Sequence, residues 1–331
     1  MHPRHTFTIA RGSSDAFDNV VLTLTGGGRA GLGLAAPSER YGQSAAGSLD
    51  ALRSVDIRDP WDIHGTLEHN AHLPSSARSA LDSALHDLAA RRLGAPVYRM
   101  LGLARPRPTT AYTLGIDDVE TTLARARELS GYPIFKVKVG GAGDVETVRA
   151  VVRETGVEVW VDANEAFPPD EAPEAARELA AAGVAMIEQP VPASEGPEAL
   201  GAAARAADPV PVIADESALV AADVPPLAGH ATGVNVKLSK CGGIRGALEV
   251  IHTARAHGMK VMLGCMVEAS PGIAAAAQVS GLADYVDLDG ALLLDDDPFA
   301  GLAYEGAEIL VPEGPGLGVE PRGEAPCGEA P

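Results

Sequence analysis

The chain has 331 residues, more than one hydrophobic core usually spans, so we expect two domains or one barrel with an appendage. Its 26 Lys and Arg residues against 45 Asp and Glu residues give a formal net charge of -19, which repels nucleic acid and anionic membrane surfaces. The N-terminal segment has no apolar signal-peptide core, and no apolar run reaches membrane-spanning length. We therefore expect a cytoplasmic protein that binds neither nucleic acid nor a membrane.

The first hundred residues combine strand-like and helical patterns. Residues 6–35 contain short apolar runs and a turn of three glycines, which predicts a β-hairpin. From Ser75, an alanine-rich segment has apolar residues at helical spacing and ends at Gly94, which predicts a helix.

After Pro106 the pattern changes to short apolar runs separated by amphipathic, alanine-rich stretches. This rhythm is typical of strands and helices alternating around a parallel sheet. Eight runs at near-constant spacing favour a closed β/α barrel, with an open doubly wound sheet as the alternative. The runs are residues 109–115, 133–139, 157–164, 184–190, 211–217, 233–239, 260–266 and 285–290.

Most of these runs separate apolar from charged residues by parity. Side chains on a strand alternate between two faces. In the run 133–139, Lys136 and Lys138 share one face, and Phe135 and the apolar residues that alternate with them share the other. In a barrel the apolar set packs outward on helices, so the charged set points inward near the C-terminal strand ends, where barrel active sites lie. The inward set is Lys136, Lys138, Asp162, Glu188, Asp215, Lys237, Asp287 and Asp289. Lys240 has the opposite parity if its strand continues, so we interpret it as a surface group or a group that supports the site from behind.

The charge of this set suggests a metal ion. Five carboxylates and three lysines sum to a formal charge of −2, which one divalent cation would balance. Asp162, Glu188 and Asp215 come from successive strands and offer only oxygen ligands, which favours Mg²⁺ over zinc. Nearby positive charge lowers a lysine pKa toward the range of a general base. Lys138 and Lys237 lie roughly across the barrel from each other, so they could remove and return a proton next to a carboxylate while Mg²⁺ stabilises the enediolate.

These residues resemble those of the dipeptide epimerases, which include the L-Ala-D/L-Glu epimerases, in the muconate-lactonizing-enzyme-type subgroup of the enolase superfamily. The resemblance runs in order through KVKVG, VDANEAF, IEQP, ADES, VNVKLSKCGG, LGCM and DLDG, and covers roughly residues 6–319. It implies an α/β fold in which an α+β capping domain closes a (β/α)7β modified TIM barrel. The implied division is a cap at 1–105, a barrel at 106–298 and a segment at 299–319 that returns to the cap. Residues 320–331 are rich in Pro, Gly and Glu, which predicts disorder.

The resemblance also implies roles for individual residues. It implies that Asp162, Glu188 and Asp215 bind Mg²⁺, that Lys138 and Lys237 are the acid/base catalysts, that Lys136 assists at the substrate carboxylate, and that Asp287 and Asp289 hold the α-ammonium group of a dipeptide. Arg11 is a candidate partner for a carboxylate on the substrate side chain. Relatives usually carry glutamates where this chain has Leu34 and Gln43, two positions in the specificity region, so the resemblance does not specify the preferred dipeptide.

Other functions are compatible with the same residues. A cycloisomerase or dehydratase of this superfamily would use one lysine as the base and the other to stabilise charge. A Schiff-base aldolase would use a barrel lysine as a nucleophile and would stay active in EDTA. A binding or structural protein on the same scaffold is the non-enzyme alternative. A homo-oligomer is also compatible with the sequence.

Overall fold

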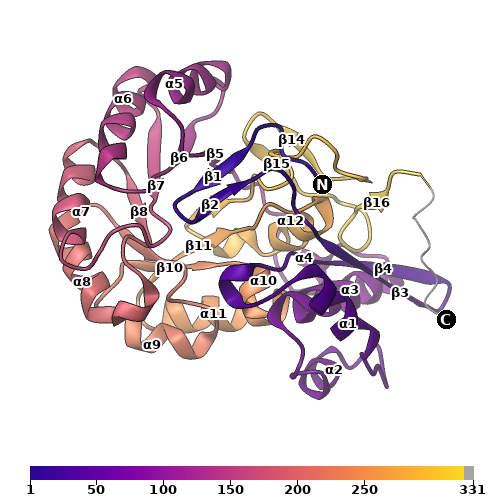
Figure 1. Ribbon diagram of the computed structural model, residues 1–331. Coiled ribbons are helices and arrows are strands. Elements are labelled where there is room, and N and C mark those ends of the chain that lie inside the picture. Colours follow the sequence, from indigo (N-terminus) through magenta and orange to yellow (C-terminus); the bar gives the residue numbers. More distant parts are fainter. Residues whose placement is uncertain (324–331) are drawn as a thin grey trace.

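The computed structural model describes residues 1–323. Its central element is a sheet of eight parallel strands that follow one another in chain order (Figure 1). The strands are β5 (Tyr112–Leu114), β6 (Ile134–Lys138), β7 (Glu158–Asp162), β8 (Met186–Glu188), β9 (Val212–Ala214), β10 (Gly233–Val236), β11 (Lys260–Gly264) and β12 (Tyr285–Asp287). Each strand lies within one of the eight predicted runs, so that prediction is confirmed.

The two ends of this sheet, β5 and β12, lie against each other. The backbone N–H of Ala111 donates to the carbonyl oxygen of Val286 at 3.1 Å. The N–H of Leu288 donates to Oγ1 of Thr110 at 2.8 Å. The sheet therefore curls into a nearly closed barrel, and the alternative of an open doubly wound sheet is excluded.

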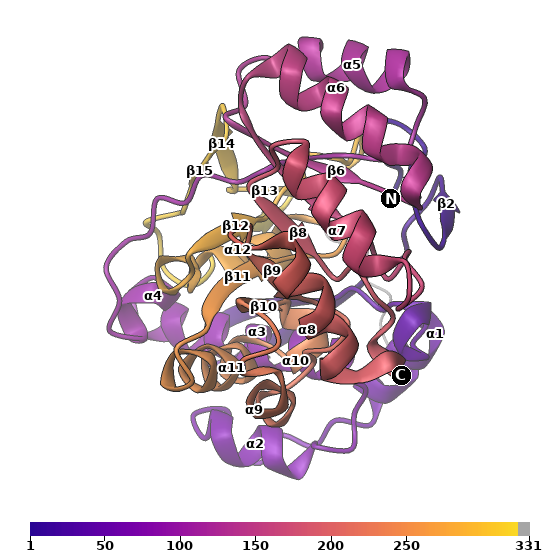
Figure 2. The same ribbon diagram turned by 90° about the vertical axis from the view of Figure 1, so that its left-hand side faces the viewer.

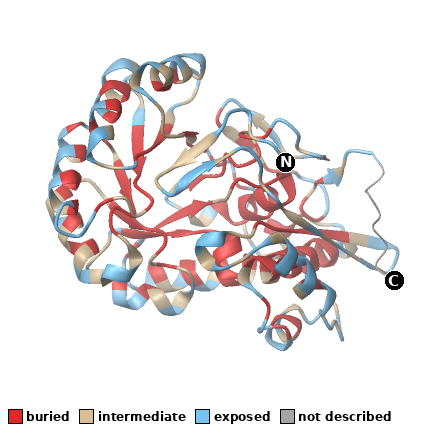
Figure 3. Ribbon diagram, in the orientation of Figure 1, coloured by how far each residue is buried: buried red, intermediate tan, exposed pale blue. Residues whose placement is uncertain are grey.

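Helices cover the outer face of the barrel, and Figure 2 shows α5 to α8 side by side along it. On α6, Val145, Val148 and Val151 are buried at one-turn spacing, so the apolar stripe of the helix faces the strands. Figure 3 shows the strands buried and the outer surfaces of the helices exposed. The barrel helices are α5 (Val119–Glu128), α6 (Val145–Thr155), α7 (Ala172–Ala181), α8 (Gly196–Ala207), α9 (Val224–Leu227), α10 (Leu238–Cys241), α11 (Ile244–Ala256) and α12 (Ser270–Ala277). Short 3₁₀ turns are η2 (Ala142–Asp144), η3 (Ala193–Glu195), η4 (Ala221–Asp223) and η5 (Ser280–Leu282). Within residues 1–323, no helix combines the length and apolar character that crossing a bilayer requires.

The N-terminal capping domain mixes strands and helices. Its elements are β1 (Phe7–Ile9), β2 (Gly12–Ser14), β3 (Val20–Gly26), β4 (Arg29–Ala35), the 3₁₀ turn η1 (Glu39–Tyr41), α1 (Ala45–Arg53), α2 (Ile63–His69), α3 (Ser75–Leu93) and α4 (Val97–Met100). The predicted hairpin at residues 6–35 divides into two hairpins, β1–β2 and β3–β4. The predicted helix is α3, which ends at Gly94 with a φ of 67°. Strand β4 packs directly on α3, because a Cβ at Gly33 would lie 1.9 Å from the carbonyl oxygen of Ala80.

The C-terminal segment runs back along the capping domain. It contains β13 (Phe299–Ala300), β14 (Ala303–Glu305), β15 (Glu308–Leu310) and β16 (Glu320–Pro321). Asp87 on α3 accepts hydrogen bonds from the N–H groups of Leu32 and Leu317, each at 2.7 Å, which ties this segment to β4. The predicted disorder is wrong for residues 320 and 321, because they pair with β13. Residues 324–331 of that predicted tail lie outside the described residues. The exact domain boundaries stay a prediction.

Candidate active site

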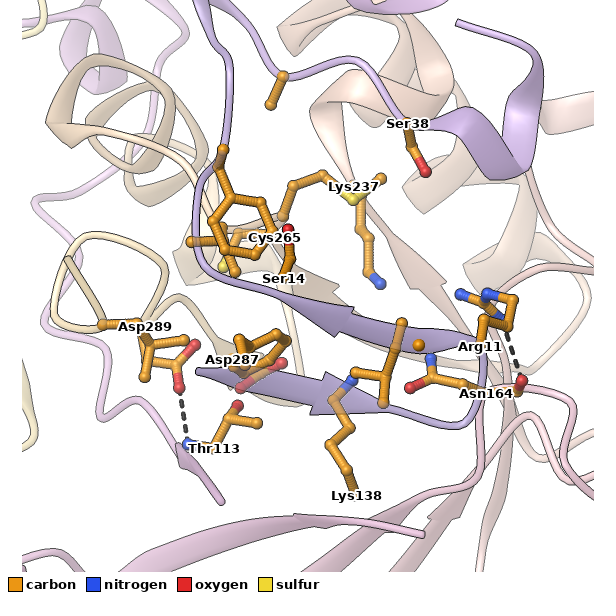
Figure 4. A pocket seen from close by; sticks show the side chains of 18 of the residues that line it. Arg11, Ser14, Ser38, Thr113, Lys138, Asn164, Lys237, Cys265, Asp287 and Asp289 are labelled. Atoms are coloured by element: carbon orange, nitrogen blue, oxygen red, sulfur yellow. Dashed lines mark hydrogen bonds between the residues drawn. The ribbon is translucent and has the colours of Figure 1, made fainter. Parts of the chain in front are cut away.

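A pocket of about 320 Å³ lies where the C-terminal ends of the barrel strands meet the β1–β2 hairpin (Figure 4). Parallel strands place their C-terminal ends on one rim, which is the usual place for a barrel active site. The pocket collects side chains from segments far apart in the chain. Those predicted from the sequence are Arg11, Lys136, Lys138, Lys237, Asp287 and Asp289.

The predicted catalytic lysines reach this pocket from opposite sides of the barrel. Lys138 is the last residue of β6 and Lys237 follows β10, and three strands separate β6 from β10 in the sheet. Both side chains are at least nine-tenths buried. Lys138 Nζ donates to Asp162 at 2.5 Å, and Lys237 Nζ donates to Asp215 at 2.6 Å. Figure 4 shows the two ammonium groups converging on the middle of the pocket from different strands.

The three predicted metal ligands come from neighbouring strands. Asp162 ends β7 and pairs in register with Glu188 at the end of β8, while Asp215 directly follows β9. All three are almost fully buried. Burial pushes the pKa of Asp162 upward, but the charges of Lys138 and Lys136 outweigh it and bring that pKa down to about 2. The pKa of Glu188 is shifted in the opposite direction, because burial and the charge of Asp162 raise it to about 8.

The donor chemistry of these carboxylates fits a hard divalent cation. In the described part of the chain, no three Asp, Glu, His or Cys side chains are arranged as ligands around a common point. Asp162, Glu188 and Asp215 instead each contact a lysine. Their oxygens are nevertheless the ligands that Mg²⁺ prefers. The raised pKa of Glu188 is that of a buried carboxylate whose negative neighbours are not fully compensated, and a divalent cation would supply that charge.

Neighbouring carboxylates raise the pKa of two of the pocket lysines. Burial lowers the pKa of Lys136, but Asp287 and Glu188 outweigh burial and raise it well above its usual value. For Lys237, Asp215 has the same dominant effect against burial. These two pKa values are raised because each ammonium group lies against carboxylates. The expectation of a lowered lysine pKa concerns Lys138 beside Lys136 and a bound cation, and it stays a prediction.

Lys240 is buried beside the site, so of its two sequence-based interpretations the surface group is wrong and the group that supports the site from behind is confirmed. Strand β10 ends at Val236 and the chain then coils into α10, so strand parity no longer applies at position 240. The side chain is buried, and its Nζ donates to the carbonyl oxygens of Asp215 at 2.7 Å and Asn235 at 2.8 Å. It also contacts the carboxylate of Asp215. Lys240 therefore supports a candidate metal ligand from behind.

Asp287 and Asp289 lie at one end of the pocket. Asp289 accepts a hydrogen bond from the N–H of Thr113 at 2.6 Å. Burial and the charge of Asp287 raise the pKa of Asp289 to about 7. Asp287 contacts Lys136 through one carboxylate oxygen, and within residues 1–323 its buried Oδ1 has no hydrogen-bond partner. This end of the pocket can accept a cationic donor.

At the opposite end, Arg11 connects the pocket to an ion-pair network whose other members sequence reasoning missed. Arg11 Nη1 donates to Glu216 at 2.8 Å and to Glu165 at 3.3 Å, and Arg40 donates to both carboxylate oxygens of Glu165 at 2.7 Å. Arg11 Nη1 also donates to the carbonyl oxygen of Asn164 at 2.9 Å. Glu165 directly follows the strand-end motif VDAN, and Glu216 directly follows the strand-end motif AD. This position next to predicted site residues could have identified both glutamates from the sequence.

Another buried carboxylate, Glu268, was also missed. It follows β11 and accepts a hydrogen bond from the N–H of Met266 at 3.3 Å. Burial raises its pKa to about 7. Neither of the two positions that depart from the resemblance, Leu34 and Gln43, lines the pocket, and Gln43 donates to Oγ of Ser75 at 2.8 Å.

Comparison with known proteins gives the same family over both parts of the chain. Residues 1–102 match the family described as mandelate racemase / muconate lactonizing enzyme, N-terminal domain, and residues 118–325 match enolase C-terminal domain-like. The L-Ala-D/L-amino acid epimerase of Maribacter sp. is 37% identical over 96% of this chain and 95% of its own. The L-Ala-D/L-Glu epimerase of Bacteroides thetaiotaomicron is 35% identical over 96% of this chain and 84% of its own. The dipeptide epimerase from Enterococcus faecalis, solved with Mg and L-Leu-L-Tyr, superposes with a TM-score of 0.91 at 30% identity and covers 96% of each chain.

Proposed function

Because the chain belongs to the enolase superfamily, in the group of mandelate racemase and muconate lactonizing enzyme, we propose that it is a Mg²⁺-dependent dipeptide epimerase. It is an isomerase that acts on amino acid derivatives, as its relatives are. The proposed reaction inverts the α-carbon of the C-terminal residue of a dipeptide. The observation that carries the proposal is the approach of Lys138 and Lys237 to one pocket from opposite strands, next to the Asp287 and Asp289 pair.

The polar groups of the pocket match the polar groups of a dipeptide. The α-ammonium group would bind Asp287 and Asp289, whose carboxylates are buried and include an oxygen that has no partner among the described residues. The peptide would then extend toward the lysines in the middle of the pocket. The buried ammonium group of Lys136, beside Glu188 and Asp287, could donate to the terminal carboxylate. These contacts fix which carbon lies between Lys138 and Lys237.

Inversion requires the two lysines to have opposite protonation states. The neutral lysine takes the α-proton and becomes an ammonium group, while the other lysine gives its proton to the opposite face of the same carbon and becomes neutral. The product is the other epimer, and the reverse reaction uses the same two groups in exchanged roles. Asp162, Glu188 and Asp215 would hold the Mg²⁺ ion. When bound, the ion would supply positive charge that stabilises the substrate carboxylate as the proton leaves and offsets the negative charge of the carboxylates beside the lysines.

Hydrogen exchange tests this proposal directly. We expect the enzyme with Mg²⁺ in D₂O to incorporate deuterium at the α-carbon of the C-terminal residue of one or more dipeptides, together with formation of the other epimer. EDTA should stop both processes and added Mg²⁺ should restore them. An enzyme that leaves this proton in place across a broad dipeptide panel would refute the proposal. Formation of an elimination product without exchange in both epimers would indicate a dehydratase or cycloisomerase instead.

A further inference from the structure

Arg11, which lines the far end of the pocket, belongs to a network of four charged side chains that neutralise one another. Arg11 lies between β1 and β2 and Arg40 lies in η1, so both arginines come from the capping domain. Glu165 follows β7 and Glu216 follows β9, so both carboxylates come from the barrel. Glu165 accepts from both arginines, and Glu216 accepts from Arg11 at 2.8 Å. Two positive and two negative groups leave this network with no formal net charge.

The two carboxylates are fixed in place. Side-chain exposure is 1% for Glu216 and 9% for Glu165, so neither can turn into water without a change in the fold. Glu165 also accepts a hydrogen bond from the N–H of Ala193 at 2.8 Å. The backbone at Asn164 and Glu165 has positive φ values of 45° and 71°, a conformation that costs energy for residues other than glycine. The surrounding structure therefore holds Glu165 toward the arginines.

The network lies where the side chain of the C-terminal residue would point. Figure 4 shows Asp287 and Asp289 at one end of the pocket and Arg11 with Asn164 at the other, with Lys138 and Lys237 between them. A dipeptide with its ammonium group at the aspartates and its reacting carbon at the lysines extends its last side chain toward Arg11.

From this arrangement we propose that Glu165 and Glu216 neutralise Arg11 and so restrict the C-terminal residue of the dipeptide to uncharged side chains. The inference rests on the proposed epimerase function and names its substrate class. A substrate carboxylate that entered this end of the pocket would lose its hydration. It would gain no net positive charge in return, because Arg11 and Arg40 are already paired with carboxylates. A substrate ammonium group would meet the guanidinium of Arg11 first. Under this proposal, Arg11 does not take the sequence-based role of partner to a substrate carboxylate.

Arg11 still has donors for a neutral partner. All three of its hydrogen bonds within residues 1–323 come from Nη1, which leaves the N–H groups of Nε and Nη2. Its side chain is 34% exposed, and it lines the pocket. A side-chain amide can accept from these N–H groups without bringing a charge. Among dipeptides of similar size, the C-terminal glutamine form should therefore be preferred over the glutamate form.

A competition experiment tests the proposal. L-Ala-L-Gln, L-Ala-L-Glu and L-Ala-L-Lys are mixed in D₂O with the Mg²⁺-loaded enzyme, and mass spectrometry follows deuterium uptake in each. The ratio of uptake rates within one mixture gives relative kcat/KM and does not depend on the fraction of enzyme that is folded. We expect the wild type to prefer the glutamine dipeptide by roughly 10-fold or more over either charged dipeptide, the size of effect that an uncompensated charge produces.

Two variants should move this ratio in opposite directions. Glu165→Gln leaves two arginines against one carboxylate and should raise the Glu-to-Gln ratio. Arg40→Gln leaves two carboxylates against one arginine and should raise the Lys-to-Gln ratio. Glu171→Gln, an exposed change farther along the same loop, should leave both ratios unchanged. Wild-type preference for L-Ala-L-Glu would overturn the inference while leaving the epimerase function intact. An increase of the same uptake ratio, Glu-to-Gln or Lys-to-Gln, in both variants would do the same. Exchange of no dipeptide at all would instead refute the epimerase function.

Discussion

Lys240 binds Asp215 on one carboxylate oxygen, Oδ1, while the other oxygen accepts a hydrogen bond from Lys237 at 2.6 Å. Burial raises the pKa of Asp215, but the charges of Lys237 and Lys240 outweigh it and hold the pKa well below its usual value. Asp215 is therefore ionised and held from two sides. In the proposed reaction Lys237 would release Asp215 to act on substrate, and Lys240 would keep the orientation of Asp215.

Replacing Lys240 should be costly for stability. Lys240→Met leaves the carbonyl oxygens of Asp215 and Asn235 without their donor and removes one partner of a buried carboxylate. Breaking a buried ion pair in this way costs about 3–5 kcal/mol of unfolding free energy. Urea denaturation followed by circular dichroism would measure the loss. Lys260→Met is the matched control, because Lys260 is 52% exposed and its pair with Asp284 should contribute less than about 1 kcal/mol. Equal effects in the two variants would contradict a supporting role for Lys240.

Replacing either of the two proposed catalytic lysines should impair proton exchange on a different face of the substrate. Each of Lys138→Ala and Lys237→Ala should slow epimerisation by roughly 10²- to 10⁴-fold, the usual contribution of a positioned acid or base. Because each lysine serves one face of the carbon, the variant that retains Lys138 should exchange the α-proton of one epimer, and the variant that retains Lys237 should exchange that of the other. NMR in D₂O on separate L,L and L,D dipeptides measures this. Exchange of the same epimer by both variants would show that the lysines do not address opposite faces.

Asp289 should impose a pH dependence on substrate capture. Burial and the charge of Asp287 raise its pKa to about 7, so the carboxylate is neutral below that pH and ionised above it. The α-amino group of a dipeptide has a pKa of about 8, so it is mostly cationic at and below pH 7. The value of kcat/KM should therefore fall as pH drops through 7, because a neutral Asp289 attracts the ammonium group less. In Asp289→Asn the inflection near pH 7 should disappear and kcat/KM should be uniformly lower. An unchanged inflection in that variant would assign it to another group, such as Glu268.

The barrel and most of its inward side chains could be predicted because strand periodicity is a local property. Asp162 and Glu188, for instance, lie on strands whose apolar neighbours fix which face points outward. Lys240 escaped the same rule because β10 ends at Val236 and the next residues coil, a change that depends on tertiary packing. Local sequence patterns also could not predict which residues of the capping domain contact the barrel. Arg40 and Glu165 are 125 residues apart, and only the folded arrangement brings them together.

Mg²⁺ binding should stabilise the fold even without substrate. A ligand that binds only the folded state adds about 2.7 kcal/mol of unfolding free energy at 100 times its Kd, so Mg²⁺ should raise the melting temperature of the wild type. Glu188→Ala removes one proposed ligand and should abolish the Mg²⁺-dependent rise, whereas Glu171→Gln should retain it. Because burial and Asp162 raise the pKa of Glu188 to about 8, metal binding near pH 7 must release a proton from it. The stabilisation should therefore grow as pH rises from 6 to 8, since fewer protons must be displaced. Thermal unfolding at several pH values measures both effects, and a Mg²⁺ shift that survives Glu188→Ala would place the ion elsewhere.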